Sequence, residues 1–187
     1  MRPPLRFPEP IESSIVLALG VAFFAATLFM GAIGRPMENA TSPSGILDYE
    51  LVGSRARAAA ILAAWDPPAR EAARTQTLWD CFLYIPVYVL ALSAWAGWCA
   101  RRLAWPALPQ LGVGLAWAMF AAGAFDMVEN RQLLAQLASG ADGDRAALAA
   151  RCAQLKFAIA YATSAYVALG SVAIGVRAAL RGRGVGT

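Results

Sequence analysis

Two carboxylates and a carboxamide lie close together where the third long apolar run of the sequence ends. Asp126, Glu129 and Asn130 are spaced at i, i+3 and i+4, so a helix through them places all three side chains on one face. Carboxylates at the edge of a bilayer are costly, and they mark either a functional site or a paired structural one. We take Asp126 and Glu129, with Asp80 at the start of the second apolar run, as candidate catalytic residues.

Several kinds of chemistry suit these residues. A carboxyl pair can transfer protons on a lipid head group while one of the two holds its proton. Carboxylate and amide oxygens can bind a hard cation such as calcium or magnesium, which takes six or more oxygen ligands. The cluster can also dock another membrane subunit, or consist only of ion pairs that fix helix register. Such pairs would join Lys156 to Asp80 or Glu129, and Arg131 to Asp126.

The composition indicates the elements that position these residues. Hydrophobic residues make up 59% of the 187-residue chain and charged residues 15%, against about 45–50% and about 25% in soluble domains. The excess is concentrated in four runs, which is typical of a helical membrane protein. We therefore expect an all-α integral membrane protein in which residues 1–187 form a single membrane domain. The expected bundle has four transmembrane helices, at about 15–33, 78–99, 108–126 and 157–176.

The first connection should contain an additional helix at about 46–65. Leu47, Leu51, Ala58, Leu62 and Trp65 recur at helical spacing and form one apolar stripe. Charges occur throughout this segment, so we expect an amphipathic helix on the membrane surface or over the end of the bundle rather than a span.

Proline marks the second long helix at two places. Asp66-Pro67-Pro68 is typical of a helix start, so the helix should begin well before its apolar part. Pro86 cannot donate a hydrogen bond to the carbonyl of Phe82, and we expect a kink there, close to Asp80.

Arginine placement predicts the orientation. One side of the four spans has seven arginines against only two acidic residues, Glu9 and Glu12, whereas the other side has mixed charge. The positive-inside rule assigns the arginine-rich side to the cytoplasm. The seven arginines are Arg2, Arg6, Arg101, Arg102, Arg177, Arg181 and Arg183. We expect a multi-pass protein of a bacterial inner membrane with both termini cytoplasmic.

This topology gathers the polar residues at the outer interface, on three helices. The expected ligand or ion-pair cluster comprises Asp80, Asp126, Glu129, Asn130, Lys156 and Tyr84. Glu38, Asn39, Asp48 and Glu50 can join it from the first connection, and Tyr88, Tyr161 and Tyr166 can line a pocket beside it.

Several function classes are excluded. The chain has no histidine, which excludes Ser-His-Asp and Cys-His catalysis and histidine-bound haem or zinc. Its three cysteines contain no CxxC pair, and a disulfide between Cys81 and Cys152 is not favoured. Basic residues do not cluster with aromatics outside the spans, so the net charge of +4 does not indicate nucleic-acid binding. We expect no cofactor and no metal.

The function expected first is that of an accessory or structural membrane protein that packs against a partner membrane complex or a second copy of itself. Small residues at four-residue spacing, such as Ala18 and Ala22, permit close helix packing. The alternative is an enzyme or binding protein for a lipid or lipophilic small molecule that uses the carboxylates at the outer interface. Membrane lipids are partners in both cases, and the sequence does not decide whether the protein is an enzyme.

Overall fold

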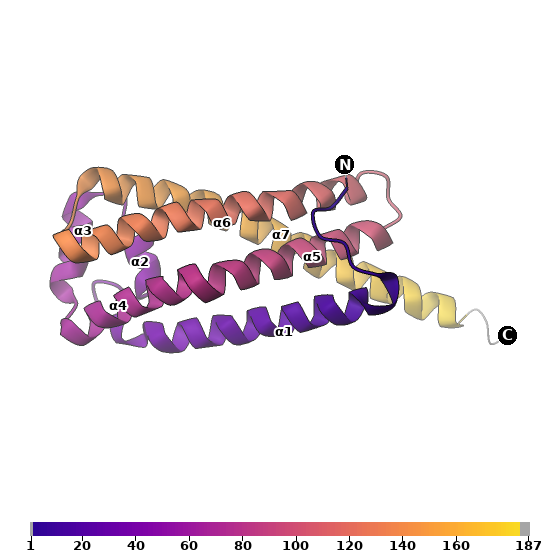
Figure 1. Ribbon diagram of the computed structural model, residues 1–187, viewed down its shortest axis with the longest axis horizontal. Helices are drawn as coiled ribbons and strands as arrows, with labels where there is room; N and C mark the ends of the chain where they lie inside the picture. The colour runs from indigo at the N-terminus through magenta and orange to yellow at the C-terminus, as the bar shows by residue number, and fades with distance from the viewer. Residues whose placement is uncertain (1, 184–187) are drawn as a thin grey trace.

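The computed structural model describes residues 2–183, and every regular element in this range is helical (Figure 1). Four helical segments are long and apolar enough to cross a membrane: Glu9–Met37, Pro67–Arg102, Leu108–Ser139 and Gly143–Arg181. The first segment contains α1 (Glu9–Gly34). The second is one continuous rod made of α4 (Pro67–Trp79), η2 (Asp80–Tyr84) and α5 (Ile85–Arg102). The third and fourth are α6 (Leu108–Ser139) and α7 (Gly143–Arg183). The prediction of an all-helical chain with four apolar helices is confirmed.

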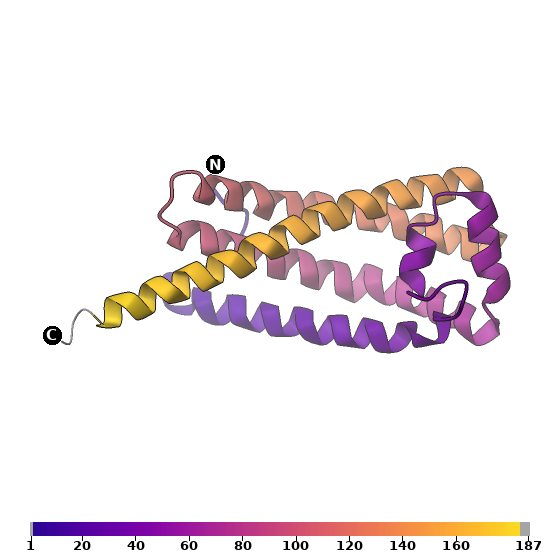
Figure 2. The same cartoon turned by 180° about the vertical axis from the view of Figure 1, so that it is seen from behind.

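Helix α5 lies at the centre of the bundle and packs against α1, α6 and α7. Helices α6 and α7 pack on each other along much of their length, while α1 packs against α5 and α4. Figure 2 shows α7 crossing the bundle obliquely, with its C-terminal end extending beyond the other helices. Close approach of α6 and α7 depends on Gly112, since a Cβ there would overlap the ring of Tyr166. The Tyr166 hydroxyl donates a hydrogen bond to the Leu108 carbonyl at 2.9 Å.

The segment expected to be one helix at 46–65 is two short helices, α2 (Ile46–Glu50) and α3 (Arg55–Ala64), so that prediction is wrong. Gly53, between them, has a φ of 64°, a left-handed conformation that interrupts an α-helix. The apolar stripe is divided accordingly, because Leu47 and Leu51 are exposed whereas Leu62 and Trp65 are buried.

These two helices and η1 (Arg35–Met37) cover one end of the bundle. The Trp65 indole donates hydrogen bonds to the Met37 carbonyl at 3.1 Å and to the Ser42 hydroxyl at 3.0 Å. Tyr49 packs edge-on against Trp65, and Leu133 of α6 belongs to the same apolar cluster. The covering segment is therefore a packed part of the fold, and it carries Glu50 at the C-terminal end of α2.

The disturbance expected at Pro86 takes the form of one π-helical turn, η2, just before the proline. The Ile85 N–H bonds to the Asp80 carbonyl, five residues earlier. Pro86 has no N–H for the Phe82 carbonyl, and a wider turn is one way for a helix to accommodate a missing bond. The rod stays helical from Pro67 to Arg102. The turn contains two of the expected cluster residues, Asp80 and Tyr84.

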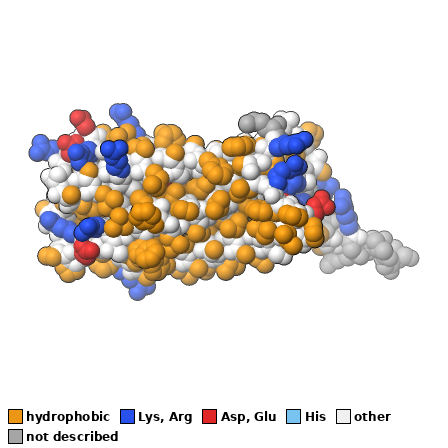
Figure 3. Space-filling view, viewed as in Figure 1, with side chains coloured by type: hydrophobic (Ala, Val, Ile, Leu, Met, Phe, Trp, Pro, Cys, Tyr) orange, Lys and Arg blue, Asp and Glu red, His pale blue; other side chains and the backbone are white. Residues whose placement is uncertain are grey.

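On the face shown in Figure 3, charged side chains gather towards the two ends of the molecule, and the middle is mostly apolar. At the end opposite the α2–α3 cover, the buried carboxylate of Glu12 accepts hydrogen bonds from Arg101 and Arg102. Nearby, the Trp117 indole donates to the Arg2 carbonyl at 3.0 Å, which holds the N-terminal arm against α6.

Candidate functional site

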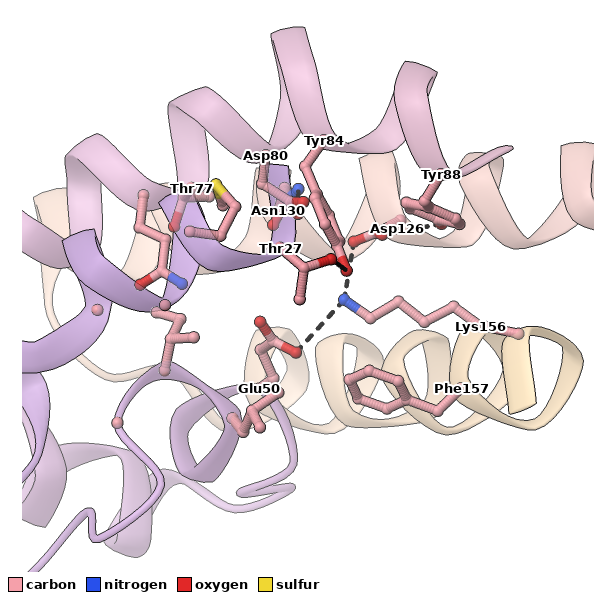
Figure 4. Close-up of a pocket in the computed structure, with 18 of the residues that line it drawn as sticks. Thr27, Glu50, Thr77, Asp80, Tyr84, Tyr88, Asp126, Asn130, Lys156 and Phe157 are labelled. Atoms are coloured by element: carbon pink, nitrogen blue, oxygen red, sulfur yellow. Dashed lines mark hydrogen bonds and ion pairs between the residues drawn. The ribbon is translucent and has the colours of Figure 1, made fainter. Parts of the chain in front are cut away.

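The centre of the candidate site is Lys156 on α7, the single lysine of the chain. Its ammonium lies 2.8 Å from Asp126 Oδ1 and 3.3 Å from Glu50 Oε2 (Figure 4). Glu129 Oε1 lies 2.9 Å from the same ammonium. All four residues are more than nine-tenths buried. The helical spacing of Asp126 and Glu129 therefore presents both to one cation, and α2 adds a third carboxylate.

A second group of hydrogen bonds joins α5 and η2 to α6. Asn130 Nδ2 donates to Asp80 Oδ2 at 2.6 Å, and the Tyr88 hydroxyl donates to Asp126 Oδ2 at 3.0 Å. Tyr84 lies beside Tyr88, with ring centroids 5.4 Å apart, and its hydroxyl is 3.3 Å from that of Thr27 on α1. Residues from α1, α2, η2, α5, α6 and α7 thus converge on one region.

This region is the polar floor of a cavity of about 520 Å³. One wall comes from α1, with Phe23, Thr27, Met30 and Gly31, and the facing wall comes from α7, with Phe157, Ala160, Tyr161 and Ser164. Thr27, Gly31 and Tyr161 are exposed, so the cavity opens sideways between α1 and α7. Glu50, Asp80, Asp126, Asn130 and Lys156 lie at its polar part.

Three buried oxygens at or beside this floor lack hydrogen-bond partners within the described residues: Glu50 Oε2, Gln76 Oε1 and Glu129 Oε2. Glu50 Oε2 has only its ion pair with Lys156. Buried oxygens without donors are uncommon in proteins and cost about 1–3 kcal/mol each. All three atoms are hydrogen-bond acceptors.

The electrostatics of Glu50 follow from its position under the end cover. Burial raises the pKa of the Glu50 carboxyl above its ordinary value of 4.5, the positive charge of Lys156 lowers it, and the negative charge of Asp126 raises it further. Burial likewise raises the pKa of the neighbouring Tyr49 hydroxyl. The ionised form of Glu50 is therefore disfavoured unless more positive charge is nearby.

The structure brings together all six residues of the expected cluster, but with different partners. Arg131 is exposed, and Asp126 is instead bound by Lys156 and Tyr88, so the expected Arg131–Asp126 pair is wrong. Position 131 follows Asn130 directly and points away from the face that carries positions 126, 129 and 130. Asp80 is hydrogen-bonded to Asn130 rather than Lys156.

Of the residues expected beside the cluster, Glu38, Glu50, Tyr88 and Tyr161 line the cavity. The others have local roles. Asn39 and Asp48 accept hydrogen bonds from backbone N–H groups of their own turns, and Tyr166 packs on Gly112 of α6. The structure has Cys81, Cys99 and Cys152 as free thiols.

Sequence reasoning missed Gln76 and Thr77 of α4, which also line the cavity. A signal for Gln76 was present, because it precedes Asp80 by four residues and a helix places such a pair on one face.

The arrangement suits binding better than metal coordination. Within residues 2–183, no group of three or more acidic or cysteine side chains is arranged to hold a metal ion. The reason is visible in the geometry, since the Lys156 ammonium lies between the carboxylates that would be the ligands. Comparison with known protein families, curated proteins and solved structures found no match to this chain.

Proposed function

We propose that this chain is a multi-pass membrane protein that binds a lipophilic small molecule in the cavity between α1 and α7. The observation that carries the proposal is the cavity itself, which joins an apolar side opening to a buried polar floor. Ligand sites in proteins commonly combine such apolar walls with a few convergent polar groups. The volume of about 520 Å³ lies within the range of small-molecule sites, about 300–1,000 Å³.

The position of the opening supports entry from a membrane. The helices on both sides of it belong to segments apolar enough to span a bilayer. Their outward faces carry exposed apolar side chains, among them Phe24 and Leu28 of α1 and Leu169 of α7. A lipophilic molecule could therefore reach the polar floor without leaving an apolar environment.

A pair of glycine substitutions tests this proposal. A Cβ at Gly31 of α1 or at Gly114 of α6 would meet no described atom within 4 Å, so both positions have room for a larger residue. Replacing a helical glycine with phenylalanine also removes part of the roughly 1 kcal/mol by which glycine is less favourable than alanine in a helix. Of these two glycines, Gly31 lines the cavity and Gly114 does not. Gly31→Phe should therefore obstruct the opening, and Gly114→Phe should not.

The measurement is purification in a mild non-ionic detergent, followed by organic extraction and mass spectrometry. We expect a lipophilic molecule to co-purify with the wild type and with Gly114→Phe, and to be lost from Gly31→Phe while the melting temperature is kept. Equal content in all three proteins, or none in any, would argue against a ligand in this cavity.

The second candidate function is the accessory role, in which the chain packs against a partner membrane protein or a second copy. Its support is the extent of exposed apolar surface on α1 and α7, including Leu17, Val21 and Val172. A stoichiometric protein partner in the same native purification, retained by Gly31→Phe, would favour this role over ligand binding.

The proposed location is a bacterial inner membrane with both termini in the cytoplasm. The support is the arginine distribution, because Arg101 and Arg102 lie at the end of the bundle where α1 starts and α7 finishes. A cysteine placed at Gly140, in the α6–α7 turn, should react with an impermeant thiol reagent in intact cells. Labelling that occurs only after the membrane is permeabilised would show that the protein has the opposite orientation.

A further inference from the structure

The single ammonium beside the cavity can balance only one ionised carboxyl group, so the other carboxyl groups either hold protons or need further positive charge. Four carboxyl groups, those of Glu50, Asp80, Asp126 and Glu129, surround a single ammonium. Each of the four is at least nine-tenths buried, and a buried surplus of one sign of charge is costly. Among the described residues that line the cavity, Lys156 is the only basic one. The cavity therefore favours an additional positive charge over an additional negative one.

The hydrogen-bonding groups of the site also favour a positively charged ligand. Of the four buried atoms without hydrogen bonds in the part of the chain that the structure describes, Glu50 Oε2, Gln76 Oε1 and Glu129 Oε2 are acceptors, and the fourth, the Tyr49 hydroxyl, does not line the cavity. Glu50 and Gln76 line the cavity directly, and both are more than nine-tenths buried. In contrast, the ammonium of Lys156 donates hydrogen bonds to Asp126 and Glu129 and lies 3.3 Å from Glu50 Oε2, so carboxylates surround it and an anionic head group would meet them first. A ligand group that donates hydrogen bonds would therefore complement the polar floor of the cavity.

Aromatic rings along the opening of the cavity also suit a cationic ligand. Phe23, Tyr84 and Tyr88 form one continuous set, with neighbouring ring centroids 6.0 and 5.4 Å apart. Phe157 and Tyr161 stack on the facing wall at 5.8 Å. Aromatic faces attract cations, and they also pack well against hydrocarbon. Both properties suit a ligand with a cationic head and an apolar body.

We infer that the ligand is a lipophilic amine in its protonated form, with a primary or secondary ammonium directed at Glu50 and Gln76 and its hydrocarbon part between α1 and α7. The inference rests on the proposed binding function and adds the chemical class of the ligand. A quaternary ammonium lacks the N–H donors, and an ammonium next to a phosphate would bring a second anion among the carboxylates.

The test is titration calorimetry of the purified protein in neutral maltoside micelles at pH 7. The probes are decylamine, decyltrimethylammonium, decanol and decanoate, which share one chain and differ in the head group, together with phosphatidylethanolamine. Decylamine should bind more tightly than each of the others. Equal or tighter binding of decanol, decanoate, decyltrimethylammonium or phosphatidylethanolamine would overturn the inference.

Variants locate the head group. Glu50→Gln keeps the shape of the side chain and removes its charge, and it should weaken decylamine binding roughly tenfold to a hundredfold, because hydrogen bonds to charged groups contribute about 1.5–3 kcal/mol. The control is Glu71→Gln, which changes an exposed carboxylate of α4 that does not line the cavity. Gln76→Leu provides a second test should Glu50→Gln not fold, and it should also weaken decylamine binding while leaving decanol binding unchanged.

The two levels of the proposal fail differently. If decanol binds as tightly as decylamine and the Glu50→Gln and Gln76→Leu substitutions have no effect, the amine inference is wrong and a ligand cavity remains supported. If none of the probes binds and Gly31→Phe changes nothing in the native purification, the ligand-binding function is wrong as well.

Discussion

Removing the ammonium of Lys156 should destabilise the protein more than removing any one of its carboxylate partners. In Lys156→Met the side chain keeps most of its apolar length, while Asp126, Glu129 and Glu50 lose the cation that lies within 3.3 Å of all three. Breaking a buried ion pair from one side costs about 3–5 kcal/mol, because an uncompensated charge stays buried. We expect a loss in this range, or a fall in melting temperature of roughly 6–20 °C for a chain of this size.

Glu129→Gln provides the comparison on the acidic side. The ammonium would keep Asp126 and Glu50, and the surplus of buried negative charge would decrease, so we expect a loss of only about 1 kcal/mol. In the double variant Lys156→Met/Glu129→Gln the loss should be smaller than in Lys156→Met alone, since one of the unpaired carboxylates is gone.

The assay is unfolding in mixed micelles of increasing sodium dodecyl sulfate fraction, followed by tryptophan fluorescence. Arg151→Met is the matched control, because it removes an exposed cation from the same helix and should change the free energy of unfolding by no more than about 0.5 kcal/mol. If Lys156→Met costs no more than Arg151→Met, or if Glu129→Gln costs more than Lys156→Met, the ammonium does not hold the cluster together as described.

Two further predictions concern pH and helix packing. Burial raises the pKa of Glu50, so the folded protein keeps this proton to higher pH than the unfolded chain. The contribution of Glu50 to the free energy of unfolding is therefore complete in acid. It decreases as pH rises from about 4.5 through the raised pKa. Glu50→Gln should flatten this dependence in melting temperatures measured from pH 4.5 to 8, and an unchanged pH profile would contradict it. Gly112→Ala should destabilise the α6–α7 contact by at least about 1–3 kcal/mol, because the new methyl group would overlap Tyr166, whereas Gly114→Ala meets open space and should be neutral or stabilising in the same unfolding assay.

The long helices could be predicted because their signal is local. Runs of apolar residues without charges indicate spans, and helical spacing by itself places Asp126, Glu129 and Asn130 on one face. The helices extend beyond the apolar runs, as α6 does to Ser139, because polar turns continue the same hydrogen-bonding pattern past the apolar segment.

The parts that could not be predicted depend on tertiary geometry. The break at Gly53 depends on the left-handed conformation of this one residue. The sequence does not reveal it, because the apolar stripe on either side of Gly53 is compatible with a continuous helix. Glu50 and Asp48 were equivalent candidates in the sequence, and only the rotation of α2 directs Glu50 to Lys156 while Asp48 accepts the Ser44 N–H. The choice of Lys156 over Arg131 as the partner of Asp126 likewise needs the packing of α7 on α6.

The pairing of Lys156 with Asp126 and Glu129 bears on how such a chain would enter a bilayer. A single helix that carries these carboxylates into hydrocarbon would lose roughly 2.5–3.5 kcal/mol for each ionised group. Helices α6 and α7 are consecutive and are joined by the short turn that contains Gly140, so they can insert as one hairpin in which the lysine already donates hydrogen bonds to both acids and balances one of the two charges. Helix α1 has no acidic or basic residue between Glu12 and Arg35 and can insert alone. Assembly of the polar floor would then be completed last, when Glu50 of the first connection meets a hairpin synthesised after it.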